Sequence, residues 1–165
     1  MKVEFRPLTF TDAARVSSRI HDYWIAVYSG EVAGGAAAVD VIFNREESPF
    51  QILAHMTAGQ VYADVTLDGT VVGLISYRVN GAEFYIDKLY VDDGYRGIGI
   101  GTVCMDHMLE QARLSMCSSA ALVVSTGNVA ASAFYGRFGF NLEGYIQVDC
   151  GNGRVGHRGR MVKRL

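Results

Sequence analysis

The strongest constraint on the fold is a change of hydrophobic period near the middle of the chain. After Gly59 the apolar residues stop following a helical spacing and alternate with a period of two. Three strand-like runs follow one another: Val61–Leu67, Val71–Val79 and Ala82–Val91. Asp68-Gly69 and Asn80-Gly81 separate these runs, and both dipeptides tolerate the positive φ angles that a tight hairpin turn demands. The pattern therefore predicts an antiparallel meander of three strands.

Helices are predicted before the meander. Val3–Arg6 alternates like a short strand, and Thr9–Asp12 then offers helix-start residues for a helix that reaches about Trp24. A second helix is predicted around Ala37–Arg45. Ser48 followed by Pro49 and, three positions after the serine, Gln51 is typical of a helix N-terminus. We expect that third helix to turn three apolar side chains inward: Phe50, Leu53 and Met56.

Helices and strands alternate after the meander. A helix from about Thr102 is predicted to bury one face, made of Met105, Met108, Leu109 and Ala112. The remaining expected elements are a strand at Ala120–Val124, a helix over Asn128–Phe138 and a hairpin of Phe140–Cys150 with Val155–Lys163 around Gly151-Asn152-Gly153. The element order predicts one α/β (α+β) domain over residues 1–165, with a mixed, mostly antiparallel sheet of about seven strands flanked by helices.

Composition narrows the classes of function. The net charge of −2 offers no basic field for nucleic acid or an anionic membrane. The chain shows no signal-peptide pattern and no apolar run of membrane-spanning length. The three cysteines, Cys104, Cys117 and Cys150, lack the spacing of a metal site and are expected to be reduced, buried thiols. We therefore expect a cytoplasmic protein without a metal site, a nucleic-acid partner or a membrane partner.

A glycine-rich loop stands directly between a predicted strand and a predicted helix. It runs Gly94-Tyr95-Arg96-Gly97-Ile98-Gly99-Ile100-Gly101-Thr102. Backbone N–H groups that have no partner point out of the first turn of a helix, and the helix dipole adds positive potential there. Glycines let an anion approach such groups closely, which favours a phosphate or pyrophosphate ligand. A P-loop would require a lysine before Thr102, and a Rossmann fingerprint would require a parallel βαβ setting and a later acid, so neither fits.

Two motifs together resemble one family. Arg96-x-x-Gly99-x-Gly101 after a strand resembles the pyrophosphate motif of the GNAT acetyltransferase superfamily, and Asn128-x-x-Ala131-x-x-Phe134-Tyr135-x-x-x-Gly139-Phe140 resembles its second signature. The resemblance covers the chain from Val61 onward and, more loosely, the N-terminal third. It implies an N-acetyltransferase that moves an acetyl group from acetyl-CoA to a primary amine by direct attack in a ternary complex.

The resemblance also implies the site. The cofactor pyrophosphate would lie on the loop residues Arg96, Gly97, Ile98, Gly99, Ile100, Gly101 and Thr102. The two isoleucines would act only through their backbone N–H groups or pack inward. Leu89, Tyr90 and Val91 would pair with the pantetheine arm, and the Leu89 N–H would polarise the thioester carbonyl. Asn128 would contact the pantetheine amides or only cap its helix. Tyr135 would protonate the departing sulfur, with a core or lid tyrosine as the alternative.

The general base and the acceptor are less defined. Many family members carry a glutamate where this chain has Tyr85; Asp87 is our first choice and Glu83 the second, against no dedicated base at all. Aromatic and acidic residues near the early helices would suit a cationic amine such as a polyamine or amino-sugar, or would simply be solvated. They are Asp22, Tyr23, Trp24, Tyr28, Glu31, Asp40, Glu46 and Glu47. The basic run from His157 to Arg164 is interpreted as an exposed edge.

Other functions and assemblies remain open at this stage. The acceptor is expected to be a small-molecule amine or a peptide. The alternatives are a non-catalytic acyl-CoA sensor and a protein N-terminal or lysine acetyltransferase. Family members often form homodimers through the sheet edge or the C-terminal hairpin.

Overall fold

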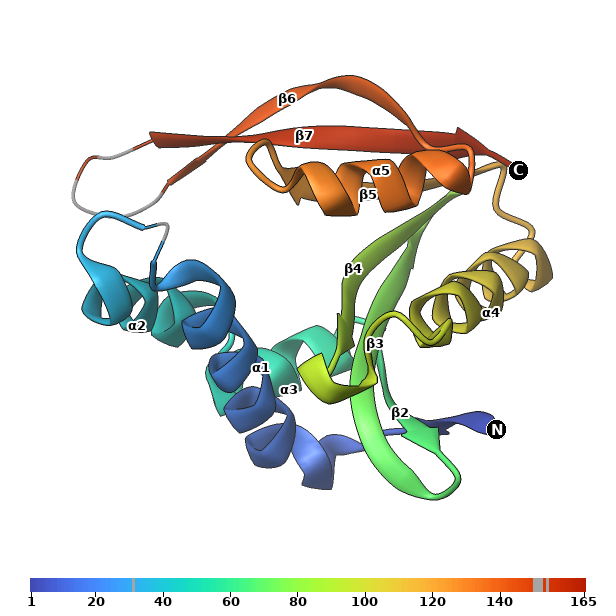
Figure 1. Ribbon diagram of the computed structural model, residues 1–165, viewed down its shortest axis with the longest axis horizontal. Coiled ribbons are helices and arrows are strands. Elements are labelled where there is room, and N and C mark those ends of the chain that lie inside the picture. The colour runs from blue at the N-terminus through green and yellow to red at the C-terminus, as the bar shows by residue number, and fades with distance from the viewer. Residues whose placement is uncertain (31, 150–152, 154) are drawn as a thin grey trace.

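A mixed sheet runs through the middle of the molecule (Figure 1). The computed structural model describes residues 1–30, 32–149, 153 and 155–165. Within these residues the sheet has seven strands in the order β1-β2-β3-β4-β5-β7-β6. The strands are β1 Val3–Pro7, β2 Val61–Leu67, β3 Thr70–Asn80, β4 Glu83–Val91, β5 Ser119–Ser125, β6 Asn141–Asp149 and β7 Val155–Arg164. The β4–β5 pair is parallel and every other described pair is antiparallel, which confirms the predicted sheet class.

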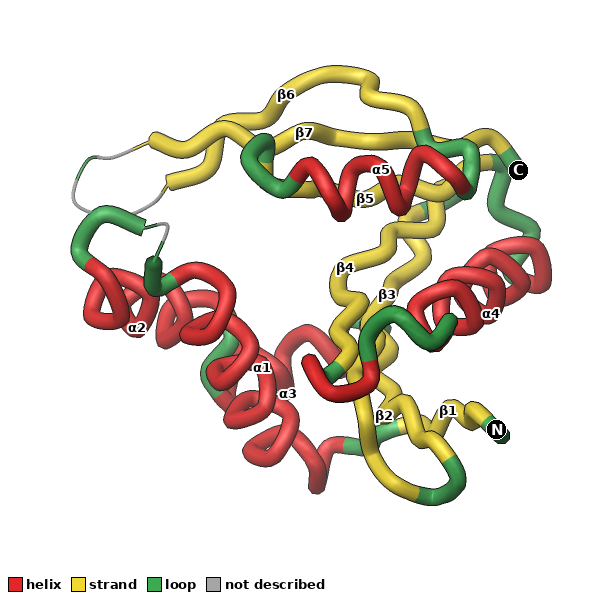
Figure 2. The backbone as a smooth tube through the Cα atoms, in the orientation of Figure 1, coloured by secondary structure: helices red, strands yellow, loops and turns green. Residues whose placement is uncertain are grey.

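The helices form a layer on each face of the sheet (Figure 2). One layer contains α1 Ala13–Tyr28, α2 Gly35–Glu46 and α3 Pro49–Thr57, and the other contains α4 Ile100–Leu114 and α5 Val129–Arg137. Ile20, Val39 and Ile52 pack against Tyr62 and Leu74 on the first face. The second face is covered chiefly by the apolar stripe of α4. That stripe consists of Met105, Met108, Leu109 and Ala112, all buried as predicted.

The third helix buries a different stripe from the one predicted. Ser48 does cap it, since its hydroxyl accepts from the Gln51 N–H at 3.4 Å. Phe50 is 75% exposed and Leu53 38% exposed, whereas Ile52 is fully buried. Ile52 and Met56 are four residues apart and therefore share a face, and Met56 packs against the core as expected. The prediction that Phe50 and Leu53 point inward was wrong. Successive side chains on a helix are about 100° apart, so a helix that buries Ile52 and Met56 turns Phe50 and Leu53 toward the solvent.

The first helix extends farther than its sequence pattern indicates. A short 3₁₀ turn, Phe10–Asp12, precedes it, and the Asp12 carboxylate accepts from the Thr9 N–H at 2.9 Å. The buried positions Val16, Ile20 and Trp24 follow a spacing of four, and the helix continues for another turn to Tyr28. Tyr28 is thereby fixed on a helix instead of lying in a loop.

The last strand is not an edge, which corrects the interpretation of the basic C-terminal run. β7 pairs with β5 on one side and with β6 on the other, so β1 and β6 form the edges of the described sheet. The predicted hairpin is present, although most of its turn (Cys150 to Asn152) lies outside the described residues.

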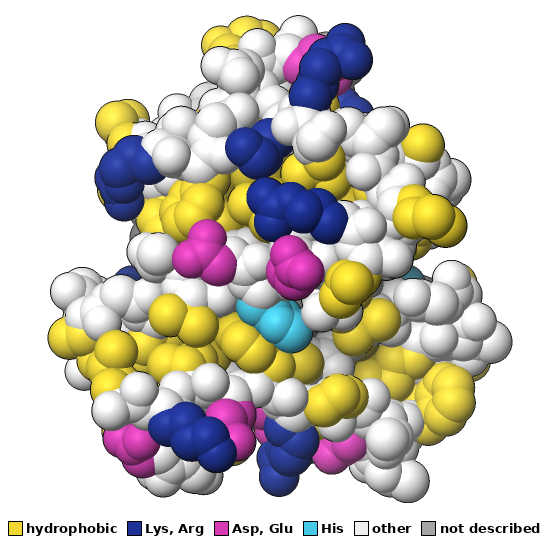
Figure 3. All heavy atoms as spheres, turned by 90° about the vertical axis from the view of Figure 1, so that its right-hand side faces the viewer, with side chains coloured by type: hydrophobic (Ala, Val, Ile, Leu, Met, Phe, Trp, Pro, Cys, Tyr) yellow, Lys and Arg dark blue, Asp and Glu magenta, His cyan; other side chains and the backbone are white. Residues whose placement is uncertain are grey.

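Two of the three cysteines agree with the expectation of buried thiols, and Cys150 lies outside the described residues. On the face that carries α4, basic and acidic side chains both occur among apolar and uncharged ones (Figure 3). Cys104 and Cys117 are free and buried, and burial raises the pKa of the Cys104 thiol to about 12. None of the described helices is long and apolar enough to cross a membrane.

Candidate active site

The two parallel strands in the middle of the sheet pair over only part of their length. β4 and β5 are in register from Glu83–Ser119 to Ile86–Leu122, yet β4 continues to Val91 and β5 to Ser125. Beyond Ile86 the C-terminal ends of the two strands are therefore not paired with each other. The Asp92 N–H donates to the Val72 carbonyl of β3 at 2.9 Å. Because backbone groups alternate along a strand, those of Leu89 and Val91 point the other way, into the opening.

The glycine loop borders this opening. After the 3₁₀ turn Asp93–Tyr95, Gly97 and Gly99 adopt left-handed φ angles of 77° and 94°, and Gly99 is the N-cap of α4. A Cβ at either glycine would meet no atom within 4 Å, so their outer side is open. The first N–H groups of α4 have no helical partner and lie at the positive end of its dipole. The loop thus offers what a pyrophosphate requires: donors, positive potential and free access.

The other residues of the loop brace it. The Arg96 Nε donates to the Val91 carbonyl at 2.9 Å, and its guanidinium forms an ion pair with Asp93 at 2.8 Å. Ile100 is buried, 1% exposed, whereas Ile98 is 49% exposed. Ile100 therefore packs inward as expected, and the Ile98 side chain is free of the core. Thr102 is exposed in the first turn of α4.

Helix α5 contacts the first turn of α4. A Cβ on Gly101 would lie 3.6 Å from the ring of Phe134, so the two helices meet closely there. Asn128 caps α5 by accepting from the Ala131 N–H at 3.0 Å, and its side chain is exposed. The cap alternative for Asn128 is therefore present in the structure, and it leaves the amide NH₂ available for a ligand.

Tyr135 is held in an apolar setting about two turns beyond Asn128 on α5. Its ring stands edge-on to Phe134 at 5.4 Å and to Phe140 at 6.2 Å. Burial raises the pKa of its hydroxyl to about 12, with a smaller contribution from Tyr28. Tyr135 thus remains protonated at neutral pH, and its hydroxyl lies within electrostatic range of the end of α1.

Asp87 lies at a β-bulge in β4 and belongs to a buried charged cluster. The bulge leaves Asp87 without a direct partner on β3, between Ile86 opposite Tyr77 and Lys88 opposite Ser76. Asp87 accepts from Lys88 Nζ at 2.5 Å and from Gln60 Nε2 at 2.7 Å. Burial acts to raise the pKa of Asp87, but the Lys88 ammonium and these two hydrogen bonds outweigh it, and the pKa lies below its ordinary value.

Lys88 joins Asp87 to a second carboxylate. Its Nζ also donates to Glu47 at 2.7 Å, and the side chains of Lys88 and Glu47 are only 4% and 8% exposed. The second oxygen of Glu47 is buried without a hydrogen-bond partner, and burial raises the pKa of this carboxyl. The sequence did not indicate that Lys88 joins two carboxylates, because Glu47 and Asp87 are 40 positions apart and only the folded chain brings them together.

The second candidate for the base is engaged elsewhere. Glu83 forms an ion pair with Arg160 at 2.6 Å, and Arg160 also reaches Glu143 at 3.1 Å. Glu83 is therefore held by β7 and is less free than Asp87 to meet an incoming amine.

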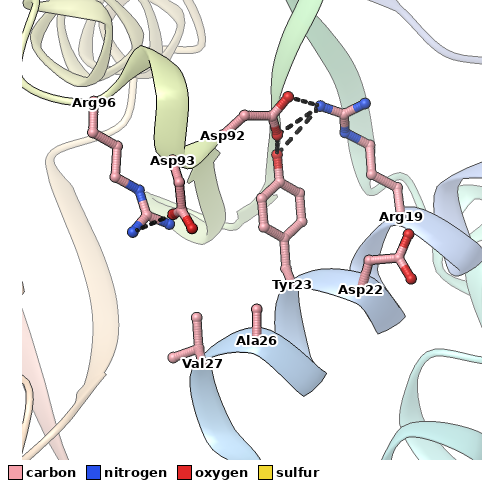
Figure 4. Close-up of a pocket in the computed structure, with 8 residues that line it drawn as sticks. All are labelled: Arg19, Asp22, Tyr23, Ala26, Val27, Asp92, Asp93 and Arg96. Carbon is pink, nitrogen blue, oxygen red and sulfur yellow. Dashed lines mark hydrogen bonds and ion pairs between the residues drawn. The ribbon is translucent and has the colours of Figure 1, made fainter.

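A cavity of about 340 Å³ opens between α1 and the loop that follows β4 (Figure 4). Arg19 and the hydroxyl of Tyr23, both on α1, donate to the Asp92 carboxylate. Asp93 pairs with Arg96 on the opposite wall, and Asp22, Ala26 and Val27 complete the lining. The cavity shares Arg96 with the glycine loop and therefore lies beside that loop.

Most of the early acidic residues are paired with basic side chains of this chain. Asp40 contacts His21 at 2.7 Å and Glu46 contacts Arg45 at 2.7 Å, while Glu47 is held by Lys88. Asp22 is exposed at the cavity, and Glu31 lies outside the described residues. No group of three or more metal-ligating side chains occurs among the residues that the structure describes.

This geometry agrees with the comparison to known families. The model of the Acetyltransferase (GNAT) family matches residues 40–140. The chain belongs to the GNAT acetyltransferase family.

Relatives of this GNAT protein support the same fold. It is 32% identical over 79 residues to the uncharacterized protein YdhI of Bacillus subtilis, covering 48% of each chain. It is 31% identical over 91 residues to N-acetylaspartate synthetase of Xenopus tropicalis, covering 54% of this chain and 34% of the relative. The chain thus spans half or less of the length of these relatives. The PaiA N-acetyltransferase of Thermoplasma acidophilum, solved in complex with coenzyme A, superposes over 100% of both chains with a TM-score of 0.78 at 18% identity.

The GNAT fold places several of the predicted site residues in one region. Leu89, Val91, Ile100 and Tyr135 belong to or pack against the same core cluster. Tyr90 packs on the opposite face of the sheet, which also carries Asp87 and Lys88. The individual roles of these residues remain predictions.

Proposed function

We propose that this GNAT protein transfers the acetyl group of acetyl-CoA to a primary amine. The observation that carries the proposal is the parted end of β4 and β5 beside the glycine loop. A sheet that opens next to a helix N-terminus offers one ligand both backbone hydrogen bonds and an anion site. Acetyl-CoA supplies an activated thioester when it is bound there.

The residues that would hold the cofactor fit its two halves. The backbone of Arg96, Gly97, Ile98, Gly99, Ile100, Gly101 and Thr102 would hold the pyrophosphate. Leu89, Tyr90 and Val91 would follow the pantetheine arm, with the exposed amide of Asn128 nearby on α5. Because the Leu89 backbone points into the opening, its N–H is suited to polarise the thioester carbonyl. The side chain of Tyr90 is turned away from this role, since its hydroxyl accepts from Trp24 Nε1 at 3.0 Å.

Tyr135 would supply a proton to the departing thiolate. A thiol has an ordinary pKa of about 8.5, whereas the pKa of Tyr135 is raised to about 12. The tyrosine is therefore protonated at neutral pH. Because a thiol is the stronger acid, transfer of the tyrosine proton to the thiolate is uphill and would be coupled to the return of a proton to the tyrosine. The new N–C bond would form as the C–S bond breaks, the tyrosine proton would pass to sulfur, and the proton lost by the amine would return through solvent to the tyrosine.

Asp87 would receive the amine. Its lowered pKa keeps it ionised at neutral pH, so it can accept a hydrogen bond from an ammonium or a water beside it. Because its pKa is low, Asp87 is a weak base. Its main role would therefore be to orient the amine, and the proton lost by the amine would pass to water.

An acceptor screen tests the proposal. Purified protein with acetyl-CoA is supplied with amino acids, polyamines, amino-sugars and peptides with free N-terminal or lysine amines, and release of free thiol is recorded. Thiol release that depends on one class of amine is the expected result. Binding of acetyl-CoA without release from any amine would contradict transfer and favour an acyl-CoA sensor, while release only with proteins would favour a protein acetyltransferase.

A further inference from the structure

Two arginines on the face of the sheet that carries Asp87 have no ion-pair partner among the described carboxylates. Arg78 on β3 lies 4.3 Å from the centre of the Tyr85 ring, and its one hydrogen bond is a 3.4 Å contact to Gln60 Oε1. Arg158 on β7 lies 6.0 Å from the centre of the Tyr28 ring. Both side chains are half-buried. A guanidinium has five N–H donors, so each has donors to spare.

The pairing of the strands places both arginines on the same face. Tyr77 stacks on Phe84 at 4.7 Å on the α4 side, so Arg78 and its direct partner Tyr85 are on the other side. On β7, Met161 is buried in the α4-side core, and Arg158 is three positions away, which puts it on the opposite face. This is the face that carries Asp87.

Gln60 links Arg78 to Asp87. Its side-chain amide accepts from Arg78 at 3.4 Å and donates to Asp87 at 2.7 Å. The pKa of Tyr85 is raised chiefly through burial, with Asp87 acting to raise it and Arg78 and Arg158 acting to lower it, which agrees with their placement on one face. On the far side Tyr28, which carries Arg158 on its ring, acts electrostatically on Tyr135. Arg158 is thus on the Tyr28 side of this face, and Arg78 is on the Asp87 side.

The carboxylates of this face are already occupied. Asp87 and Glu47 share Lys88, and Glu83 and Glu143 share Arg160. The Arg45 guanidinium contacts Asp149 at 3.2 Å and joins α2 to the end of β6, which bounds one side of the face (Figure 1). The groups that remain open to a ligand are the exposed part of the Asp87 carboxylate and the guanidinium groups of Arg78 and Arg158. This arrangement suits a molecule with an amine and an anionic group.

We infer that the acceptor is a small amine that also carries a carboxylate, such as an amino acid, with Arg78 and Arg158 binding the carboxylate. The inference rests on the proposed function and reverses the earlier expectation of a cationic amine such as a polyamine. The amine of the acceptor meets Asp87, and the carboxylate is held on the side of β3 and β7.

Binding can be measured without turnover. Trp24 is the one tryptophan of the sequence and stands edge-on to Tyr28 at 6.0 Å, so its fluorescence reports on ligands beside Tyr28. The protein, saturated with coenzyme A, is titrated with amino acids, with the matching amino-acid amides, with spermidine and with phosphoethanolamine. We expect saturable binding of at least one amino acid and at least tenfold weaker binding of its amide.

Variants connect this preference to the arginines. Arg78→Gln and Arg158→Gln should each weaken binding of the amino acid about ten- to a hundredfold, because each removes a charged hydrogen bond worth about 1.5–3 kcal/mol. Arg158→Glu should shift the preference toward the amide or spermidine. Arg113→Gln is the matched control, since Arg113 is on α4 and pairs only with Glu110 at the surface. The affinity of Arg113→Gln for the amino acid should equal that of the unmodified protein. All variants should retain their affinity for coenzyme A.

The outcomes separate this inference from the proposed function. Selective amino-acid binding without any thiol release supports the carboxylate site and contradicts transfer. Thiol release with amides or spermidine as good as with amino acids supports transfer and overturns the carboxylate site. Tighter binding of phosphoethanolamine than of every amino acid overturns the choice of carboxylate, and no binding by any amino acid overturns the inference altogether.

Discussion

At the scale of single residues, the pKa values of two ionisable groups near the opening are shifted in opposite directions. Burial among aromatic rings keeps Tyr135 neutral, while Lys88 and Gln60 keep Asp87 ionised. Groups whose pKa values are pushed apart in this way are suited to act as a proton donor and as a hydrogen-bond acceptor in one reaction. Each assignment can be tested by a change of one atom or of pH.

Tyr135→Phe removes the hydroxyl and leaves the ring packed against Phe134 and Phe140. We expect kcat to fall about 10²- to 10⁴-fold, the usual contribution of general acid catalysis, with little change in KM for acetyl-CoA. Steady-state thiol release measures both constants. Tyr145→Phe is the control, because Tyr145 is 65% exposed on β6. An unchanged kcat in Tyr135→Phe would reduce Tyr135 to a packing residue.

The pH dependence of kcat follows from the raised pKa of Tyr135. The group loses its proton only as the pH approaches about 12, so it stays a competent acid over the whole range of an ordinary assay. We expect kcat to rise as the acceptor amine is deprotonated and then to remain level up to about pH 10, the ordinary pKa of a free tyrosine. A falling limb between pH 8 and 10 that is absent in Tyr135→Phe would contradict the high pKa.

At the scale of elements, the bulge in β4 turns two consecutive residues toward the helical layer of α1, α2 and α3. Asp87 and Lys88 both face the cluster that Glu47 completes from the end of α2. The glycine loop and the meander were predicted correctly because their residues are contiguous and their turn chemistry is local. The bulge, the buried lysine and the position of β7 could not be predicted, since they depend on strand order and on pairing between distant segments.

Lys88→Met should destabilise the fold severely. It leaves the buried carboxylate of Glu47 and the partly buried carboxylate of Asp87 without their shared cation, and breaking a buried ion pair in this way costs about 3–5 kcal/mol. Urea unfolding at pH 7 measures the loss. Lys2→Met is the contrast, because the Lys2–Glu4 pair is exposed and such pairs contribute little to stability.

A triple variant checks the cause of that loss. Glu47→Gln and Asp87→Asn, added to Lys88→Met, remove the unpaired charges and should restore much of the stability. Equal stability of Lys88→Met and the unmodified protein, or no recovery in the triple variant, would show that the cluster does not act as one charged unit.

At the scale of the whole molecule, the sheet consists of two parts that meet through four residue pairs between β4 and β5. Sequence patterns predicted the elements of both parts and the loop between them. They could not predict that Arg78 and Arg158 lie on the face of the sheet that carries Asp87, because the two arginines are 80 positions apart and their placement depends on strand order and on pairing between distant segments.

A ligand that binds both parts should stabilise the whole fold. Acetyl-CoA at a hundred times its Kd adds about 2.7 kcal/mol, which raises Tm by about 5–11 °C for a chain of this size. Gly99→Glu should abolish the shift, because it places bulk and negative charge where the pyrophosphate is proposed to bind. Gly59→Glu is the matched control: its φ of 93° is nearly that of Gly99, and it also faces open space, so it introduces the same backbone strain away from the loop. Acetyl-pantetheine, which lacks the pyrophosphate, should shift Tm little in any of the three proteins. A full shift in Gly99→Glu, or loss of the shift in Gly59→Glu alone, would contradict the assignment of the loop.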